Sequence, residues 1–225
     1  MRRVVVLYRS SVGKKVLMAV TGFIWFGFLV GHMVGNLKLY NGAEHFNEYA
    51  HHLRLIGVPL LPPSGYLWAF RAFVFTAFLI HVIMAWETSK ASWDARSTKY
   101  RNQENLSFSF TSRFMRWGGV FILIFMAFHI LHLTTGQLHP NFVEGAAYEN
   151  TILGLSNPWI AAFYMLALVA VCAHLYHGLW SMFQSLGAAH PKYHRFRRPF
   201  AIIMAAVIFI GFISVPVAVL TGFRS

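Results

Sequence analysis

The chain is poor in cysteine, in charged residues and in acidic residues. Its one cysteine is Cys172, so it cannot form an internal disulfide or hold an iron–sulfur cluster by itself. Only 12% of its 225 residues are charged, 57% are hydrophobic and the mean hydropathy is +0.53. These values lie outside the range of a soluble globular domain. No internal repeat, low-complexity tract or linker divides the sequence, so we expect a single integral membrane domain over residues 1–225.

Long apolar stretches dominate what is present. The fourth of them lies in a run without Asp, Glu, Lys or Arg between Glu149 and Lys192. Each stretch reaches the roughly 20 residues that a helix needs to cross a bilayer. The basic N-terminus resembles a signal peptide, but its apolar stretch is too long and no cleavage site follows, so we expect an uncleaved first helix. The sequence predicts an all-α membrane protein with five transmembrane helices at about 16–37, 66–86, 117–136, 157–183 and 199–221.

The distribution of Lys and Arg predicts the orientation. With five spans the termini lie on opposite sides, and one side receives fifteen basic residues against four on the other. Because basic residues stay on the cytoplasmic side, we expect a cytoplasmic N-terminus and an extracytoplasmic C-terminus. The net charge of +12 then reflects topology, not nucleic acid binding. The larger set is Arg2, Arg3, Arg9, Lys14, Lys15, Lys90, Arg96, Lys99, Arg101, Arg113, Arg116, Lys192, Arg195, Arg197 and Arg198, and the smaller is Lys38, Arg54, Arg71 and Arg224.

The connecting segments differ in character. Between the first two spans, NGAEHFNEYAHHLRLIGVPLLPPSG predicts a short amphipathic helix on the outer surface, closed by prolines. The segment from Glu87 to Arg113 is long and polar and suits contact with a soluble partner on the cytoplasmic side. The fifth span has no histidine and contains Pro216, so we expect it to serve as scaffold.

Histidines within the spans sort into two depths. From the helix rise, His32 lies ~24 Å and His129 ~18 Å above the cytoplasmic side, with His132 one turn higher than His129. His81 and His174 lie ~8–13 Å from that side. Histidines at membrane depth need partners, and these depths predict an outer pair from the first and third helices and an inner pair from the second and fourth.

Paired imidazoles from facing helices suit haem, because each neutral ring offers one nitrogen to an axial position of the iron. Gly27, Gly31 and Gly35 recur beside His32 and would allow a flat group or another helix to approach. The five helices are therefore predicted to form a haem-binding bundle. His132 and His177 each lie one turn from a better candidate, with a propionate or a quinone as other partners. The remaining histidines, His45, His51, His52, His139, His190 and His194, are expected to be solvated, and Cys172 to be a small core residue.

Four segments carry a family resemblance: FLVGHMVGN with the following NGAEHFNEYAHHL, AFLIHVIMAWE, IFMAFHILH and AHLYHGLWSMF. Their order and spacing resemble the cytochrome b subunit of succinate dehydrogenase or fumarate reductase, in its single-chain, five-helix, two-haem form. The resemblance covers nearly all of the chain. It implies two haem b groups, the outer bound by His32 and His129 and the inner by His81 and His174.

The same resemblance implies a role in succinate:quinone oxidoreductase, in respiration and the tricarboxylic acid cycle. Such subunits lie in the cell membrane, anchor a flavoprotein and an iron–sulfur subunit on the cytoplasmic face, and exchange electrons with a membrane quinone, more often menaquinone than ubiquinone. The succinate or fumarate site belongs to a partner, and a higher oligomer of the complex is open. Glu44 is a candidate proton relay at a quinone site near the outer haem; the alternative is that it caps or solvates the surface helix.

Two other functions remain as alternatives. A haem-free transporter could use the histidines as a proton relay, and it would show no haem spectrum. A bis-histidine cytochrome b could instead anchor a hydrogenase or a formate dehydrogenase, but the GAEHFN segment and the order of the five helices argue against that. The sequence fixes neither the direction of the reaction nor the haem potentials.

Overall fold

The computed structural model describes residues 10–95, 108–188 and 190–222. Helices make up most of this part of the chain, and short 3₁₀ and π segments follow two of them. The α-helices are α2 (Ser11–Leu37), α3 (Ala43–Leu55), α4 (Gly65–Asp94), α5 (Phe108–His129), α6 (Ala147–Ser156), α7 (Pro158–Ser185) and α8 (Pro191–Leu220). The 3₁₀ segment is Lys38–Asn41 and the π-helical segment is Ile130–Thr134.

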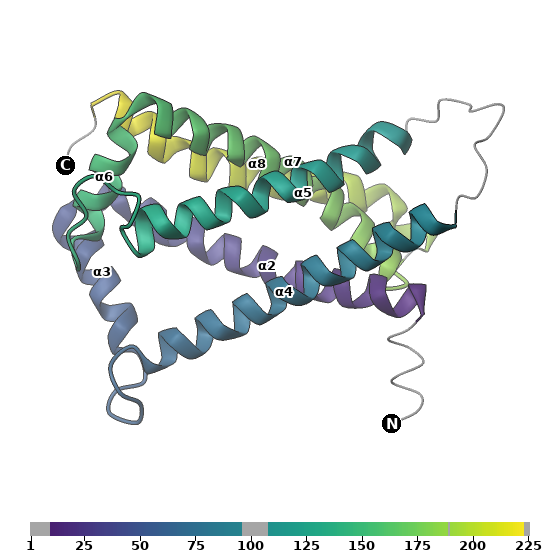
Figure 1. Ribbon diagram of the computed structural model, residues 1–225, viewed down its shortest axis with the longest axis horizontal. Coiled ribbons are helices and arrows are strands. Elements are labelled where there is room, and N and C mark those ends of the chain that lie inside the picture. The colour runs from purple at the N-terminus through teal and green to yellow at the C-terminus, as the bar shows by residue number, and fades with distance from the viewer. Residues whose placement is uncertain (1–9, 96–107, 189, 223–225) are drawn as a thin grey trace.

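The helices α2, α4, α5, α7 and α8 are each long and apolar enough to cross a membrane, which confirms the predicted fold class. They run up and down side by side, and the two ends of the chain lie at opposite ends of the bundle (Figure 1). The end that carries the start of α2 is called the Ser11 end. The opposite end, where α3 and α6 lie together, is called the α3 end.

Several helices extend beyond the stretches predicted from hydropathy. α2 begins at Ser11, α4 continues to Asp94 and α8 begins at Pro191, because apolar length reports only the part of a helix that faces lipid. The start of α2 is capped by Ser10, whose hydroxyl accepts from the Gly13 N–H at 3.0 Å. The proposed docking segment from Glu87 is therefore helical at its beginning, and its residues 96–107 lie outside the described part of the chain.

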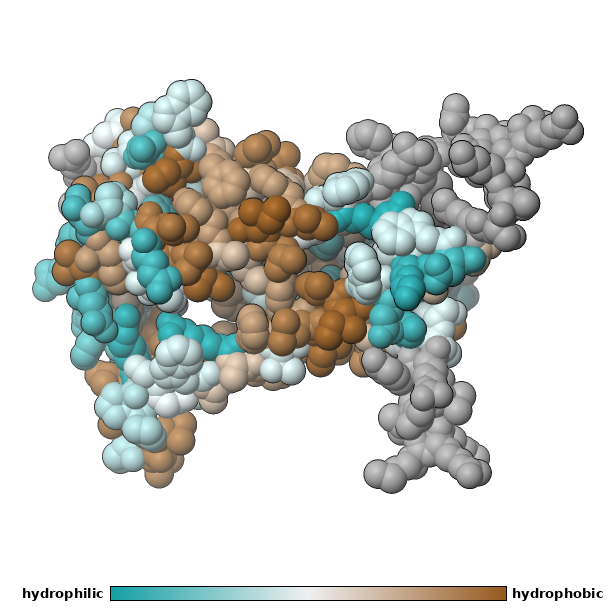
Figure 2. All heavy atoms as spheres, in the orientation of Figure 1, coloured by the Kyte–Doolittle hydropathy of each residue, from teal (hydrophilic) through white to brown (hydrophobic). Residues whose placement is uncertain are grey.

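The spans are packed unequally against one another. α2 packs on α4, α7 and α8, and α7 packs on α8 and α5. A buried core between α2, α7 and α8 includes Met33, Leu175, Leu179 and Ile208, and the free thiol of Cys172 lies in it, as expected of a small core residue. By contrast, α4 lies mainly against α2, and α5 mainly against α7. Figure 2 shows the molecule hollowed between α4 and the helices above it, near the α3 end.

Large apolar side chains cover the middle of the molecule on the outside. Phe73, Leu166, Ile202 and Ile210, among many others, are more than half exposed, and Figure 2 shows hydrophobic residues in a central zone between two more hydrophilic ends. Exposure of this kind would be costly in water and is favourable in lipid. The surface thus agrees with the prediction of a membrane domain.

The α3 end is closed by a buried polar cluster that the sequence did not predict. His139 is 7% exposed; its Nε2–H donates to the carbonyl of Asn150 at 2.9 Å and its Nδ1 accepts from the Asn141 N–H at 3.1 Å. The Asn150 side chain bonds both the N–H and the carbonyl of Val143. The expectation that His139 is solvated was wrong, because the short helix α6 covers this loop. The sequence of α6 has no apolar periodicity, so this helix was not predicted.

Gly154 of α6 gives a stability prediction. A Cβ there would lie 2.8 Å from Cε1 of His132 and 3.1 Å from Cδ2 of His139, closer than carbon atoms pack. Both rings are buried and hydrogen-bonded, so we expect Gly154→Ala to destabilise the chain by about 1–3 kcal/mol and to lower its thermal unfolding midpoint in detergent. The matched control is Gly118→Ala, whose Cβ would meet Phe114 at an ordinary 3.6 Å. Equal midpoints for the two variants would contradict this packing.

Candidate functional site

The outer pair consists of His32 of α2 and His129, the last residue of α5. Their ring centroids lie 5.8 Å apart with the ring planes at 83°. Phe28 stacks on His32 at 5.3 Å, and Phe125 lies against His129 at 5.7 Å. The two imidazoles thus face each other inside an apolar cage of aromatic rings near the α3 end.

The inner pair consists of His81 of α4 and His174 of α7. Their ring centroids lie 6.3 Å apart with the planes at 63°. His81 meets α2 at Thr21, whose Oγ1 is 3.3 Å from the His81 Nδ1. Because Thr21 precedes His32 by eleven residues on α2, the two pairs are separated by about 16 Å along the bundle.

The spacing within each pair fits a metal ion bound between the rings. An imidazole nitrogen binds a first-row metal ion at about 2.0–2.1 Å, so two imidazoles on opposite sides of one ion have centroids about 6 Å apart. Both observed separations, 5.8 and 6.3 Å, agree with this. In the described part of the chain no cluster of three or more His, Cys, Asp or Glu residues could hold a metal ion. Paired axial ligands of haem iron need only two.

The hydrogen bonds of the inner pair leave nitrogens available. The His81 Nδ1–H donates to the carbonyl of Met18 at 3.0 Å, which leaves the lone pair on Nε2 free to bind a metal ion. Among the described residues, the buried Nδ1 of His174 has no hydrogen-bond partner. A buried nitrogen without a partner is costly in a packed interior, and a bound group beside it would account for the cost.

Glycines leave space beside the outer pair. A Cβ at Gly27 or Gly31 would meet no atom within 4 Å, whereas one at Gly35 would lie 3.0 Å from the hydroxyl of Tyr49. The three glycines therefore have two roles. Gly35 allows α3 to approach α2, and Gly27 and Gly31 leave one side of α2 open. Open space next to an imidazole pair fits a flat group such as porphyrin.

The neighbouring histidines are placed differently. His177 lies edge-on to Trp180 at 5.7 Å, one turn beyond His174 on α7. His132 is fully buried, 0% exposed, and its Nδ1 lies 2.9 Å from the hydroxyl of Tyr164. Among the described residues, neither the His132 ring nor the His177 ring stacks on a histidine of α2 or α4. The sequence left both open to a secondary role, and the structure places both beside the pairs.

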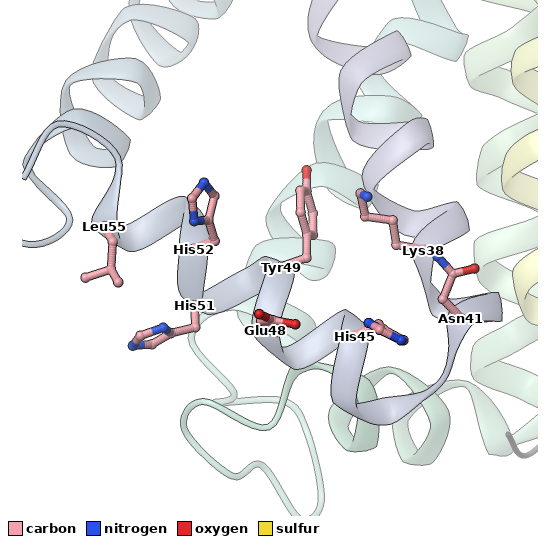
Figure 3. A pocket seen from close by; sticks show the side chains of 8 residues that line it. All are labelled: Lys38, Asn41, His45, Glu48, Tyr49, His51, His52 and Leu55. Atoms are coloured by element: carbon pink, nitrogen blue, oxygen red, sulfur yellow. The ribbon is translucent and has the colours of Figure 1, made fainter.

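Glu44, the candidate proton relay, is exposed in the first turn of α3. One turn further, Glu48 lines a cavity of about 440 Å³ between α3 and the end of α2. Figure 3 shows Glu48 beside His45, with Lys38 and Tyr49 across the opening, where the Lys38 ammonium lies 5.0 Å from the centre of the Tyr49 ring. The sequence singled out the first glutamate of this helix, whereas it is the second that faces the cavity.

A bundle of long apolar helices with two histidine pairs at different depths is the architecture of a multi-pass membrane protein. Family comparison agrees with this class of protein. The model of the succinate dehydrogenase/fumarate reductase transmembrane subunit family matches residues 93–215, more than half of the chain, so the chain belongs to that family and is a multi-pass membrane protein. The matched segment includes His129 and His174. No curated protein and no solved structure matched the chain.

Proposed function

We propose that the chain is the di-haem b membrane anchor of a succinate:quinone oxidoreductase, passing electrons between an iron–sulfur subunit and a membrane quinone. The observation that carries this proposal is the presence of two imidazole pairs, with centroids 5.8 and 6.3 Å apart, contributed by four different spans. Haem bound at each pair would supply a one-electron carrier within the bilayer. Membership of the family supports association with the other subunits of such a complex.

The chain's own residues have defined tasks in this proposal. His32 and His129 would hold the outer haem, and His81 and His174 the inner haem. The apolar rings around them exclude water and leave the imidazoles neutral, which is the form that binds a metal ion. The carbonyl of Met18 fixes the orientation of His81.

Soluble partners are proposed to dock at the Ser11 end. Lys14, Lys15, Lys90 and Arg116 all belong to helix segments at that end, and a concentration of basic residues favours the cytoplasmic side. Lys14 is already paired with Glu87 at 2.8 Å. The other basic residues of this end would suit an acidic surface on a flavoprotein or iron–sulfur subunit.

The quinone is proposed to bind at the α3 end, at the level of the outer pair. The cavity under α3 offers a carboxylate, imidazoles and an ammonium in one place, which are groups that can donate protons to a quinone as it is reduced. Glu44 lies at the start of the same helix and is the proposed relay to the outside. Menaquinone is the proposed substrate, with ubiquinone as the other candidate.

The pyridine haemochrome of the purified complex tests the proposal. We expect two haem b groups per chain, with the soluble subunits present in the same preparation. A preparation without haem would remove the proposal and favour a haem-free proton relay. Two haems with hydrogenase or formate dehydrogenase subunits in place of the succinate-linked ones would contradict the assignment of the complex.

A further inference from the structure

The hydroxyl of Tyr164, on α7, lies between two imidazoles of the α5 segment. It is 2.9 Å from the Nδ1 of His132 and 3.3 Å from the Nδ1 of His129. Phe125 and Phe128 pack edge-on against the Tyr164 ring, at 5.1 and 6.0 Å. A hydroxyl carries one proton and two acceptor lone pairs, so it can donate to at most one of these two nitrogens.

Metal binding by His129 would determine the direction of its hydrogen bond with Tyr164. A neutral imidazole that binds a metal ion through Nε2 carries its proton on Nδ1. The His129 Nδ1–H then donates to the Tyr164 oxygen, and the single hydroxyl proton is donated to the Nδ1 of His132. His132 would then hold its own proton on Nε2, a buried atom that has no hydrogen-bond partner among the described residues. This arrangement makes both contacts, gives the hydroxyl proton an acceptor and leaves the Nε2 of His129 free for iron.

We propose that Tyr164, held in place by His132, is the positioning residue of the outer haem: it fixes the tautomer and the ring orientation of His129. This inference rests on the proposed function. It assigns His132 a role next to the ligand, which the sequence left open.

The fold holds this arrangement rigidly. A π-helical segment begins directly after His129, with the Thr135 N–H bonded to the carbonyl of Ile130 at 2.9 Å, and π turns shift the register of the residues that follow them. His132 packs against α6, because Gly154 has no side chain in the way of its ring. The ring of His139 lies 5.2 Å from that of His132. The acceptor of the tyrosine proton is thus buried on all sides.

The two pairs differ in how their ligands are oriented. The inner His81 is bonded to a backbone carbonyl, that of Met18, which no side-chain substitution can remove. The outer His129 depends on the hydroxyl of one side chain. A substitution at Tyr164 should therefore affect one haem and spare the other, which makes the inference separable from a general loss of stability.

The test is Tyr164→Phe in the purified complex, with optical redox titration and low-temperature electron paramagnetic resonance of both haems. We expect two haem b groups, an upward shift in the midpoint potential of the outer haem and an unchanged inner haem. The shift is upward because a hydrogen bond from Nδ1–H makes the imidazole a stronger electron donor to ferric iron, and its loss weakens that donation. The resonance of the outer haem should change with it.

Tyr176→Phe is the matched control. Tyr176 lies on the same helix and packs, partly buried, against the core of α2, α7 and α8, so both potentials should stay at their original values. Loss of one haem from Tyr164→Phe alone would also support the role of the hydroxyl. Unchanged potentials in Tyr164→Phe, or equal haem loss in both variants, would overturn the inference. A wild-type complex without haem would instead overturn the proposed function, and this inference with it.

Discussion

His32→Ala should leave one haem b per chain in place of two and abolish quinone reduction by the complex. The substitution removes one ring of the pair whose centroids lie 5.8 Å apart and leaves His81 and His174, about 16 Å further along the bundle, untouched. The complex should still assemble and oxidise succinate with an artificial acceptor that takes electrons before the membrane. Haem content and both activities are measured on one preparation.

His177→Ala provides the control for this variant, because its ring contacts Trp180 and lies outside both pairs. It should keep two haems and full quinone activity. If His32→Ala kept full quinone activity with one haem missing, the quinone site would lie at the Ser11 end. The proposed path across the bundle would then be wrong.

His81→Ala should also cost one haem b, but with a different functional result. The inner pair lies nearer the proposed docking end, so its loss should stop electrons from reaching the membrane part at all, and the outer haem should no longer be reduced by succinate. Optical spectra with succinate and then with dithionite distinguish the two steps. Removal of the Nδ1–H also leaves the Met18 carbonyl without its donor, which adds a cost on the order of 1 kcal/mol in stability.

The outcome that would contradict the inner pair is specific. If His81→Ala retained both haems while His177→Ala lost one, the ligand on α7 would be His177, although its ring lies against Trp180 in the structure. The pairing of α4 with α7 would then need revision.

Depth along the helices predicted which spans contribute to each pair. Each residue of a helix rises by a constant amount, so counting paired the first span with the third and the second with the fourth, and the family resemblance favoured His129 over His132 and His174 over His177. The structure places the rings of His32 and His129, and those of His81 and His174, side by side. Whether they bind haem stays a prediction. The apolar stretches gave the five spans for the same reason, since bilayer thickness sets their length.

Rotation about a helix axis and short irregular segments were not predictable in this way. The partnership of Tyr164 with His129 and His132 depends on how α7 is turned toward α5 and on the π-helical segment, and hydropathy carries no information on either. α6 was missed because it is ten residues long and is held by polar contacts, such as the side-chain Oδ1 of Asn47 accepting from the Tyr148 N–H at 2.9 Å. Glu48 faces the cavity because of the rotation of α3, which the sequence pattern left unassigned.

The loose attachment of α4 has a consequence for how the protein is made. This helix lies mainly against α2, and the imidazole of His81 meets that of His174 on α7. A group bound between those rings would therefore link α4 to α7. Because it would bind only when the two helices are packed together, it would stabilise the packed bundle by mass action. Supply of the cofactor would then govern how many newly inserted chains survive the quality-control proteases of the membrane.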